Sequence, residues 1–209
     1  MEEKAKNAVK TFEDLAQAVA DSGRPYDAGR IEKAYEMAAA AHAGQTRLSG
    51  ESYVSHPVAV ACLVVDLGLD TDSVVAALLH DSVEDTETTA EDVKAAFGPD
   101  VALLVDGVTK LGRIKFSSVE EQQAENLRKM LLAMSKDVRV MLIKLCDRLH
   151  NMRTGDAWPE QKRRDKARET MEVYAPIANR LGILNVKEEL EDRSLHYLDP
   201  VGYEEISRM

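Results

Sequence analysis

The strongest constraint on this chain is the spacing of its apolar residues. They recur at helical intervals in one segment after another, and no segment shows the strict alternation typical of a half-buried strand. Short polar turns that contain glycine or proline separate these segments. Alanine and leucine are abundant, whereas aromatic residues make up only 5% of the 209 residues. The sequence therefore predicts an all-α fold, a helical bundle of about ten helices.

Several of the expected helices have recognisable start and stop signals. Pro57 suits a first helical turn, because its missing N–H would be unpaired there. Thr88 and Glu91 have the spacing of a capping box, and Gly98-Pro99 should end the helix that begins there. The expected helices are Thr11–Ala20, Asp27–His42, Pro57–Leu67, Thr71–Asp85, a helix from Thr88 to Gly98, Val101–Val108, Glu120–Met134, Val138–Arg153, Gln161–Ala178 and Lys187–Leu195. The polar segment Thr109–Ser118 is expected to be a mobile loop.

The balance of charge argues against a nucleic-acid partner. The formal net charge is −10, whereas proteins that grip duplex nucleic acid usually present a basic domain. Residues 136–168 are an exception, with ten Lys or Arg against five Asp or Glu. This segment could serve a small anionic ligand, and the alternative is an ordinary solvated helix face.

Cysteine usage and hydropathy bear on the compartment. Cys62 and Cys146 lie within apolar helical patterns, so they indicate core residues in a reducing compartment. The N-terminus has no apolar signal region. The longest apolar run, Pro57–Val65, is too short to span a bilayer. We therefore expect a cytoplasmic protein with no membrane partner.

One group of polar residues follows a run that must be buried. After the apolar residues Val74–Leu79, the chain presents His80, Asp81, Glu84 and Asp85. On a helix, residues four apart share a face, which would place His80 near Glu84 and Asp81 near Asp85. Clustered carboxylates raise one another's pKa values unless a cation lies among them. The pattern favours a divalent metal site with acids one turn beyond the ligands.

A second buried helix carries a similar signal. Asp147 emerges from the mostly apolar run Val140–Cys146, and Asn151 and Thr154 continue its stripe at helical spacing. Together with His56 and His80, the two aspartates Asp81 and Asp147 would form a mixed nitrogen and oxygen set. Such a set suits Mn²⁺, Fe²⁺ or Zn²⁺ with open positions better than a closed structural zinc site.

A metal of this kind can activate water, and Glu84 and Asp85 would then be placed to move protons. A salt-bridged surface is the plain alternative for the whole set. The histidines His42, His150 and His196 are expected to be structural.

The residues above resemble a known family, the long RelA/SpoT-type enzymes that make and degrade the alarmone (p)ppGpp. The similarity is to their N-terminal HD hydrolase domain and covers about residues 27–209. The stretches that carry it are Ala43-Gly44-Gln45, Ser49-Gly50-Glu51, Tyr53 to His56-Pro57, Ala76 to Asp81, Val83 to Thr86, Val105 to Leu111, Glu121 to Asn126, Asp147–Thr154, Tyr174-Ala175-Pro176 and Arg180-Leu181-Gly182.

The resemblance implies a manganese-dependent hydrolase that removes the 3′-pyrophosphate of ppGpp or pppGpp in the stringent response, releasing GDP or GTP and pyrophosphate. By this resemblance, the metal ligands are His56, His80, Asp81 and Asp147, and the catalytic acids are Glu84 and Asp85. The implied nucleotide-binding residues are Arg47, Ser49, Asn151 and Thr154, with Arg164 as a further phosphate contact.

The resemblance also implies an organisation. Residues 1–26 would be an N-terminal helical extension, 27–185 the HD phosphohydrolase domain, and 186–209 a helical connector towards a synthetase domain. We therefore expect the chain to be the hydrolase part of a longer protein, whose synthetase and regulatory domains would be its partners.

The chain departs from the family pattern at a few positions. Leu48 follows Arg47 where the family usually has a second basic residue, and Ser82 replaces an apolar residue within the acidic motif. Two alternatives therefore stay open: an HD-type hydrolase of another nucleotide, and a non-catalytic alarmone-binding module. The intact Glu84 and Asp85 argue against the second, because a binding module needs no proton-transfer pair.

Overall fold

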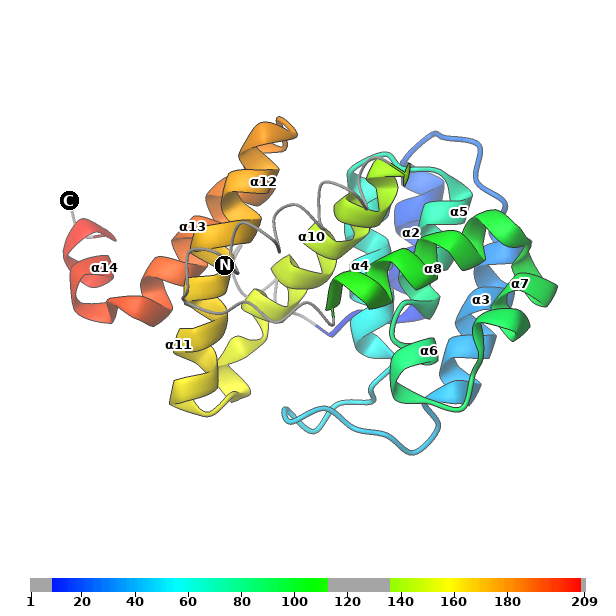
Figure 1. Cartoon of the computed structure of the whole chain (residues 1–209), viewed down its shortest axis with the longest axis horizontal. Coiled ribbons are helices and arrows are strands. Elements are labelled where there is room, and N and C mark those ends of the chain that lie inside the picture. Colours follow the sequence, from blue (N-terminus) through cyan, green and yellow to red (C-terminus); the bar gives the residue numbers. More distant parts are fainter. Residues whose placement is uncertain (1–8, 113–135, 208–209) are drawn as a thin grey trace. The chain divides into compact units, whose positions relative to one another are not determined.

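The computed structural model describes residues 9–112 and 136–207, which are helical apart from connecting turns and one isolated β-bridge between Thr46 and Ser52 (Figure 1). The predicted all-α class is confirmed. The α-helices are α2 (Phe12–Asp21), α3 (Ala28–Ala41), α4 (Ser55–Asp66), α5 (Thr71–Leu79), α6 (Ser82–Asp85), α7 (Ala90–Phe97), α8 (Pro99–Gly112), α10 (Val138–Arg153), α11 (Glu160–Glu169), α12 (Ala175–Arg180), α13 (Leu184–Leu198) and α14 (Pro200–Ser207). A 3-10 turn, η1 (Gly155–Ala157), and a π-helical segment, η2 (Thr170–Tyr174), complete the set.

By its internal contacts the chain divides into two units, one ending at Cys146 and the other beginning at Asp147. The division falls inside α10, which is continuous through it. The domain boundaries expected after residues 26 and 185 come from the family resemblance and not from internal contacts, and they stay predictions.

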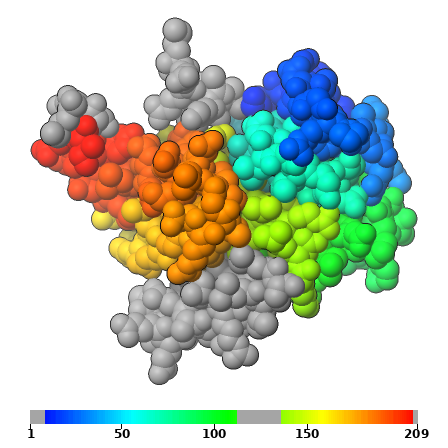
Figure 2. Space-filling model, turned by 90° about the horizontal axis from the view of Figure 1, so that it is seen from above, coloured from blue at the N-terminus to red at the C-terminus, as the bar shows by residue number. Residues whose placement is uncertain are grey.

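Helix α5 is the centre of the N-terminal unit. Its residues Val74–Leu79 are fully buried, and it packs against α3, α4 and α8. Helix α2 covers α4, and α7 pairs with α8. In the space-filling view the blue surface of α2 and α3 adjoins the cyan surface of α4 (Figure 2). The buried run Val74–Leu79 thus explains why other helices surround α5, since a helix that is apolar on all sides must be covered on all sides.

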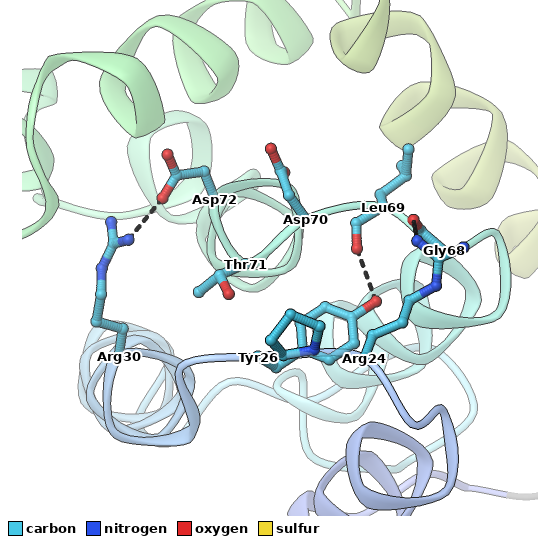
Figure 3. A pocket seen from close by; sticks show the side chains of 9 residues that line it. Arg24, Tyr26, Arg30, Gly68, Leu69, Asp70, Thr71 and Asp72 are labelled. Carbon is cyan, nitrogen blue, oxygen red and sulfur yellow. Dashed lines mark hydrogen bonds and ion pairs between the residues drawn. The ribbon is translucent and has the colours of Figure 1, made fainter.

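Polar contacts tie the turn before α3 to the turn before α5 (Figure 3). Arg24 donates to the Gly68 carbonyl over 2.7 Å, and the Tyr26 hydroxyl donates to the Leu69 carbonyl over 2.6 Å. The charged groups of Arg30 and Asp72 lie 2.7 Å apart. These residues line an open pocket, and their contacts join the two turns and the starts of α3 and α5.

A glycine brings α10 close to α8. A Cβ atom added at Gly107 would lie 2.7 Å from Cγ2 and 3.0 Å from Cγ1 of Val140. Val140 is buried, so only a residue without a side chain fits opposite it. This close approach positions the part of α10 that leads to Asp147.

The C-terminal unit is held by ion pairs that are partly or fully buried. Arg153 binds the Glu189 carboxylate through two hydrogen bonds of 2.7 Å, and Arg193 adds a third of 3.0 Å. Buried Arg148 lies 3.0 Å from Glu169, and its guanidinium carbon is 4.2 Å from the ring centre of Tyr174. The Arg153–Glu189 pair joins α10 to α13 and the Arg148–Glu169 pair joins α10 to α11, whereas the Arg193–Glu189 pair lies within α13.

Three expectations about the course and ends of helices differ from the structure. The helix expected to run to Asp85 stops at Leu79, and His80 and Asp81 form a turn before the short α6. The capping box lies one residue later than predicted, on Thr89 and Asp92. The helix expected at Gln161–Ala178 is interrupted by the π-helical segment η2.

The interruption has a local cause. Pro176 follows η2, and a proline inside a regular helix would lack an N–H and clash with the carbonyl four residues earlier.

The mobile loop expected at Thr109–Ser118 is wrong in its first part, because Thr109–Gly112 belongs to α8. Its remaining residues, 113–118, and the helix expected at Glu120–Met134 lie outside the described residues.

Candidate metal centre

Two buried histidines face each other at helix ends. His56 is the second residue of α4 and His80 directly follows α5, with 3% and 2% of their surfaces exposed. Their ring centres are 5.3 Å apart in an edge-on arrangement. His80 Nδ1 lies 2.7 Å from the Ala77 carbonyl, which accepts a hydrogen bond only from a protonated Nδ1. The lone pair of His80 is then on Nε2, the atom that a metal would bind.

Two aspartates complete the donor set. Asp81 places Oδ1 3.0 Å from His80 Nε2 and Oδ2 3.6 Å from His56 Nε2. His56, His80 and Asp147 each offer one ligand atom within 4.8 Å of the other two, and Asp147 is 4% exposed. Asn151 Nδ2 donates to Asp147 Oδ1 over 2.5 Å and so orients this carboxylate.

The chemistry of this set fits a divalent transition metal. Ligands about 2.1 Å from one ion lie about 3.0–4.2 Å apart, so donor atoms spaced by up to 4.8 Å would have to move closer together around it. Imidazole nitrogens and carboxylate oxygens suit Mn²⁺, Fe²⁺ or Zn²⁺. His56, His80 and Asp147 are therefore a possible metal site, and the role of Asp81 as a fourth ligand stays a prediction.

The predicted acidic pair lies on α6, with both Glu84 and Asp85 exposed. A tyrosine connects this pair to Asp81: the Tyr53 hydroxyl is 2.7 Å from Asp85 Oδ2 and 3.2 Å from Asp81 Oδ2. Burial of Tyr53 and the two nearby carboxylates raise its pKa, so the hydroxyl keeps its proton and donates. Because both carboxylates contact the same hydroxyl, Asp81 and Asp85 lie close together on one face of the chain, as the helical spacing predicted.

Sequence reasoning gave Tyr53 no role. The signal was its place three residues before His56, one helical turn from a predicted ligand.

Arg47 and Ser49 lie on a tight loop between α3 and α4. The Thr46–Ser52 bridge closes it, and the Arg47 N–H donates to the Glu51 carbonyl over 2.9 Å. Gly50, with φ +90°, makes the reversal possible. Leu48 projects from this loop with 69% of its surface exposed.

The other predicted substrate residues lie in the C-terminal unit. Asn151 is engaged with Asp147, as described, and the Thr154 hydroxyl donates to the His150 carbonyl over 3.1 Å just beyond the end of α10. Arg164 is a half-exposed residue of α11. The roles of these three residues stay predictions.

Comparison with known protein families identifies the class of domain. The HD domain family matches residues 34–184, and the chain belongs to this family. Within it, the chain is 49% identical over 198 residues to the bifunctional (p)ppGpp synthase/hydrolase SpoT of Escherichia coli K12. That match covers 95% of this chain and 28% of the relative. The predicted resemblance to RelA/SpoT-type enzymes is confirmed.

Two further comparisons agree. A probable guanosine-3′,5′-bis(diphosphate) 3′-pyrophosphohydrolase of Synechocystis is 54% identical over 179 residues, covering 86% of this chain and 24% of the relative. A solved structure described as a metazoan ortholog of SpoT that hydrolyzes ppGpp matches with a TM-score of 0.52 and 31% identity. It covers 88% of this chain and 97% of that one. The chain thus spans about a quarter of the length of the curated relatives.

Among the described residues, every helix falls short of the length and apolar character needed to cross a membrane.

Proposed function

We propose that this chain hydrolyses the 3′-pyrophosphate of ppGpp or pppGpp, releasing pyrophosphate and GDP or GTP. The observation that carries the proposal is the gathering of His56, His80 and Asp147 within 4.8 Å, with Asp81 in contact with both histidines. Two relatives that are 49% identical over 198 residues, which cover 95% of this chain and 28% of each relative, are named for this hydrolysis. A metal-donor set beside an acidic pair is the machinery that such a hydrolysis requires.

We propose Mn²⁺ as the ion and His56, His80, Asp81 and Asp147 as its ligands. A bound divalent ion supplies charge neutralisation for phosphate oxygens and a lowered pKa for water. The chain's own contribution is to fix the donor atoms, through the bond from His80 Nδ1 to Ala77 and the bond from Asn151 to Asp147.

Glu84 and Asp85 are the proposed proton-transfer groups. In the reaction, a water oxygen forms a bond to the first phosphorus of the 3′-diphosphate, and the bond from that phosphorus to the ribose 3′-oxygen breaks. An exposed carboxylate on α6 accepts the proton that the water loses, and the pair returns a proton to the departing 3′-oxygen. Their exposure allows them to reach a substrate bound outside the buried ligands.

Arg47, Ser49, Asn151, Thr154 and Arg164 are the proposed nucleotide contacts. Arginine side chains suit diphosphate oxygens because they offer several N–H donors in a fixed geometry. Leu48 favours one alternative, an HD-type hydrolase of another nucleotide, because an exposed apolar side chain stands beside Arg47. A guanine-nucleotide substrate would place the protein in the cytoplasm.

We further propose that residues 27–185 form the catalytic domain, preceded by a helical extension and followed by a connector. The family match to 34–184 supports this division. The synthetase and regulatory domains of a longer protein would be the partners of this chain, in keeping with the greater length of its relatives.

The test is pyrophosphate release from ppGpp after chelation and return of Mn²⁺. Asp81→Ala should abolish turnover through loss of the metal. Glu84→Ala should keep most of the Mn²⁺ affinity and lose about 10²–10⁴-fold in rate. Glu91→Ala is the matched control, because Glu91 is an exposed acid on the next helix, with 85% of its side chain accessible.

The alternatives give different results. Hydrolysis of another nucleotide without hydrolysis of ppGpp would support the second candidate. Tight binding of ppGpp without turnover at any Mn²⁺ concentration would indicate a binding module. Full activity of Glu84→Ala would remove its proton-transfer role.

A further inference from the structure

The Tyr53 hydroxyl contacts carboxylates with two different proposed tasks. Asp81 is a proposed metal ligand and Asp85 a proposed proton-transfer group, and each has an oxygen within 3.2 Å of the Tyr53 oxygen. Two carboxylates near one point repel each other. A neutral donor between them offsets this repulsion and fixes which oxygen of each carboxylate faces it.

The ring of Tyr53 is held in place by His42. The two rings are stacked, with centres 4.5 Å apart and planes inclined by 16°. His42 is 2% exposed, and its Nδ1 lies 2.9 Å from Gln45 Oε1. Its Nε2 lies 3.5 Å from the hydroxyl of Ser82.

This contact gives a structural reason for Ser82, the polar residue found where the family pattern is apolar. A buried histidine needs a polar neighbour on each ring nitrogen, and Ser82 stands at the second one.

The same tyrosine closes the loop that carries Arg47. The Tyr53 N–H donates to the Gln45 carbonyl over 3.1 Å, at the base of the loop. Gln45 also contacts His42 through its side chain. One small network thus connects the proposed substrate loop, the supporting His42 and the two carboxylates.

We propose that Tyr53 is a positioning residue for the hydrolysis: its hydroxyl holds Asp81 in its metal-binding orientation and Asp85 in its proton-transfer orientation. The expected effect of Tyr53 on the rate of hydrolysis rests on the proposed function. Its expected effect on metal affinity, through Asp81, does not, because metal binding is measured without substrate. His42 acts through Tyr53 by fixing the plane of its ring.

The test is Tyr53→Phe in the full chain. The substitution removes the hydroxyl and keeps the ring that stacks on His42. We expect kcat for ppGpp to fall about 10- to 100-fold with KM changed less than threefold, because the nucleotide contacts are untouched. We expect Mn²⁺ affinity of the chelated protein, titrated by calorimetry without substrate, to fall about 10-fold.

Tyr26→Phe is the matched control. It also removes a tyrosine hydroxyl that donates a 2.6 Å hydrogen bond, to the Leu69 carbonyl, and Tyr26 contributes nothing to the proposed site. Both variants should lose some stability, and only Tyr53→Phe should lose rate and metal affinity. Rates and affinities are taken per folded molecule, with the folded fraction measured by urea unfolding.

The outcomes separate the two proposals. If the parent chain does not hydrolyse ppGpp, the proposed function fails and the Mn²⁺ titrations alone decide the role of Tyr53. If the parent chain is active, and Tyr53→Phe keeps kcat and Mn²⁺ affinity within twofold, the positioning role is wrong. A Tyr53→Phe protein that does not fold would also overturn it, in favour of a structural role.

Discussion

Gly107→Ala should destabilise the protein, although alanine is the better helix former. In an unstrained helix, replacing glycine by alanine adds roughly 0.4–1 kcal/mol to the free energy of unfolding. At Gly107 the new Cβ would lie 2.7 Å and 3.0 Å from the two methyl groups of Val140. Valine in a helix has one strongly preferred rotamer, so relief of both contacts costs either that rotamer or a wider spacing of α8 and α10. Overpacking of this kind costs about 1–3 kcal/mol.

Gly29→Ala is the comparison that isolates this cost. Gly29 is an exposed residue of α3, and its new Cβ would meet only Asp27 Oδ1, at an ordinary 3.6 Å. The two variants should therefore differ by about 1–3 kcal/mol in urea unfolding. For a chain of this size, that corresponds to a melting-temperature difference of roughly 2–12 °C.

A second substitution tests the assigned cause. In Gly107→Ala/Val140→Ala the nearest valine atom left opposite the new Cβ is the Cβ of residue 140, at 3.5 Å, an ordinary contact. The double variant should be more stable than the sum of the single effects predicts, by about 1–3 kcal/mol. Equal stability of Gly107→Ala and Gly29→Ala, or strict additivity in the cycle, would refute the packing argument.

The remaining predictions concern the C-terminal unit and the substrate loop. Burial alone would raise the pKa of Glu189, but Arg153 and Arg193 outweigh it and lower the pKa to about 2. The resulting stability, up to about 3 kcal/mol, is present above the unfolded pKa of about 4.5 and is lost as the pH falls towards 2. Unfolding measured from pH 6 to pH 2 should show this loss, and Glu189→Gln should flatten it; an unchanged slope would contradict the pairing. Leu48→Lys should lower KM for ppGpp about two- to fivefold at low salt, because it adds an exposed positive charge beside Arg47, and an effect that persists unchanged in 0.5 M salt would rule out that electrostatic reason.

Where the local signal is strong, the sequence predicts the structure closely. Helix α10 has the bounds expected for it, Val138–Arg153, because an apolar stripe runs through its whole length. The start of α7 was missed by one residue, because Thr88 and Thr89 both begin a capping pattern. Which of them caps depends on a contact from outside the pattern: the Thr86 hydroxyl accepts the Thr88 N–H over 3.1 Å.

Some residues of the candidate site could likewise be predicted from the sequence, and others could not. Residue types and helical spacing indicated His80, Asp81 and Asp147, since polar groups inside apolar helices are conspicuous in a sequence. The contact between Tyr53 and Asp85 spans 32 positions and follows no period, so only the fold reveals it. His42 looks like any buried histidine until its stacking on Tyr53 is seen.

The end of α5 at Leu79 shows why the expected continuous helix would have suited this site less well. The last carbonyls of a helix have no partner within it. The Ala77 carbonyl lies in that last turn and receives the hydrogen bond from His80 Nδ1. In an unbroken helix the Ala77 carbonyl would also accept from the Asp81 N–H, and His80 would have to share this acceptor. The break therefore leaves this carbonyl to His80, whose Nε2 lone pair is then available to the donor set, at the point where the helical pattern fails.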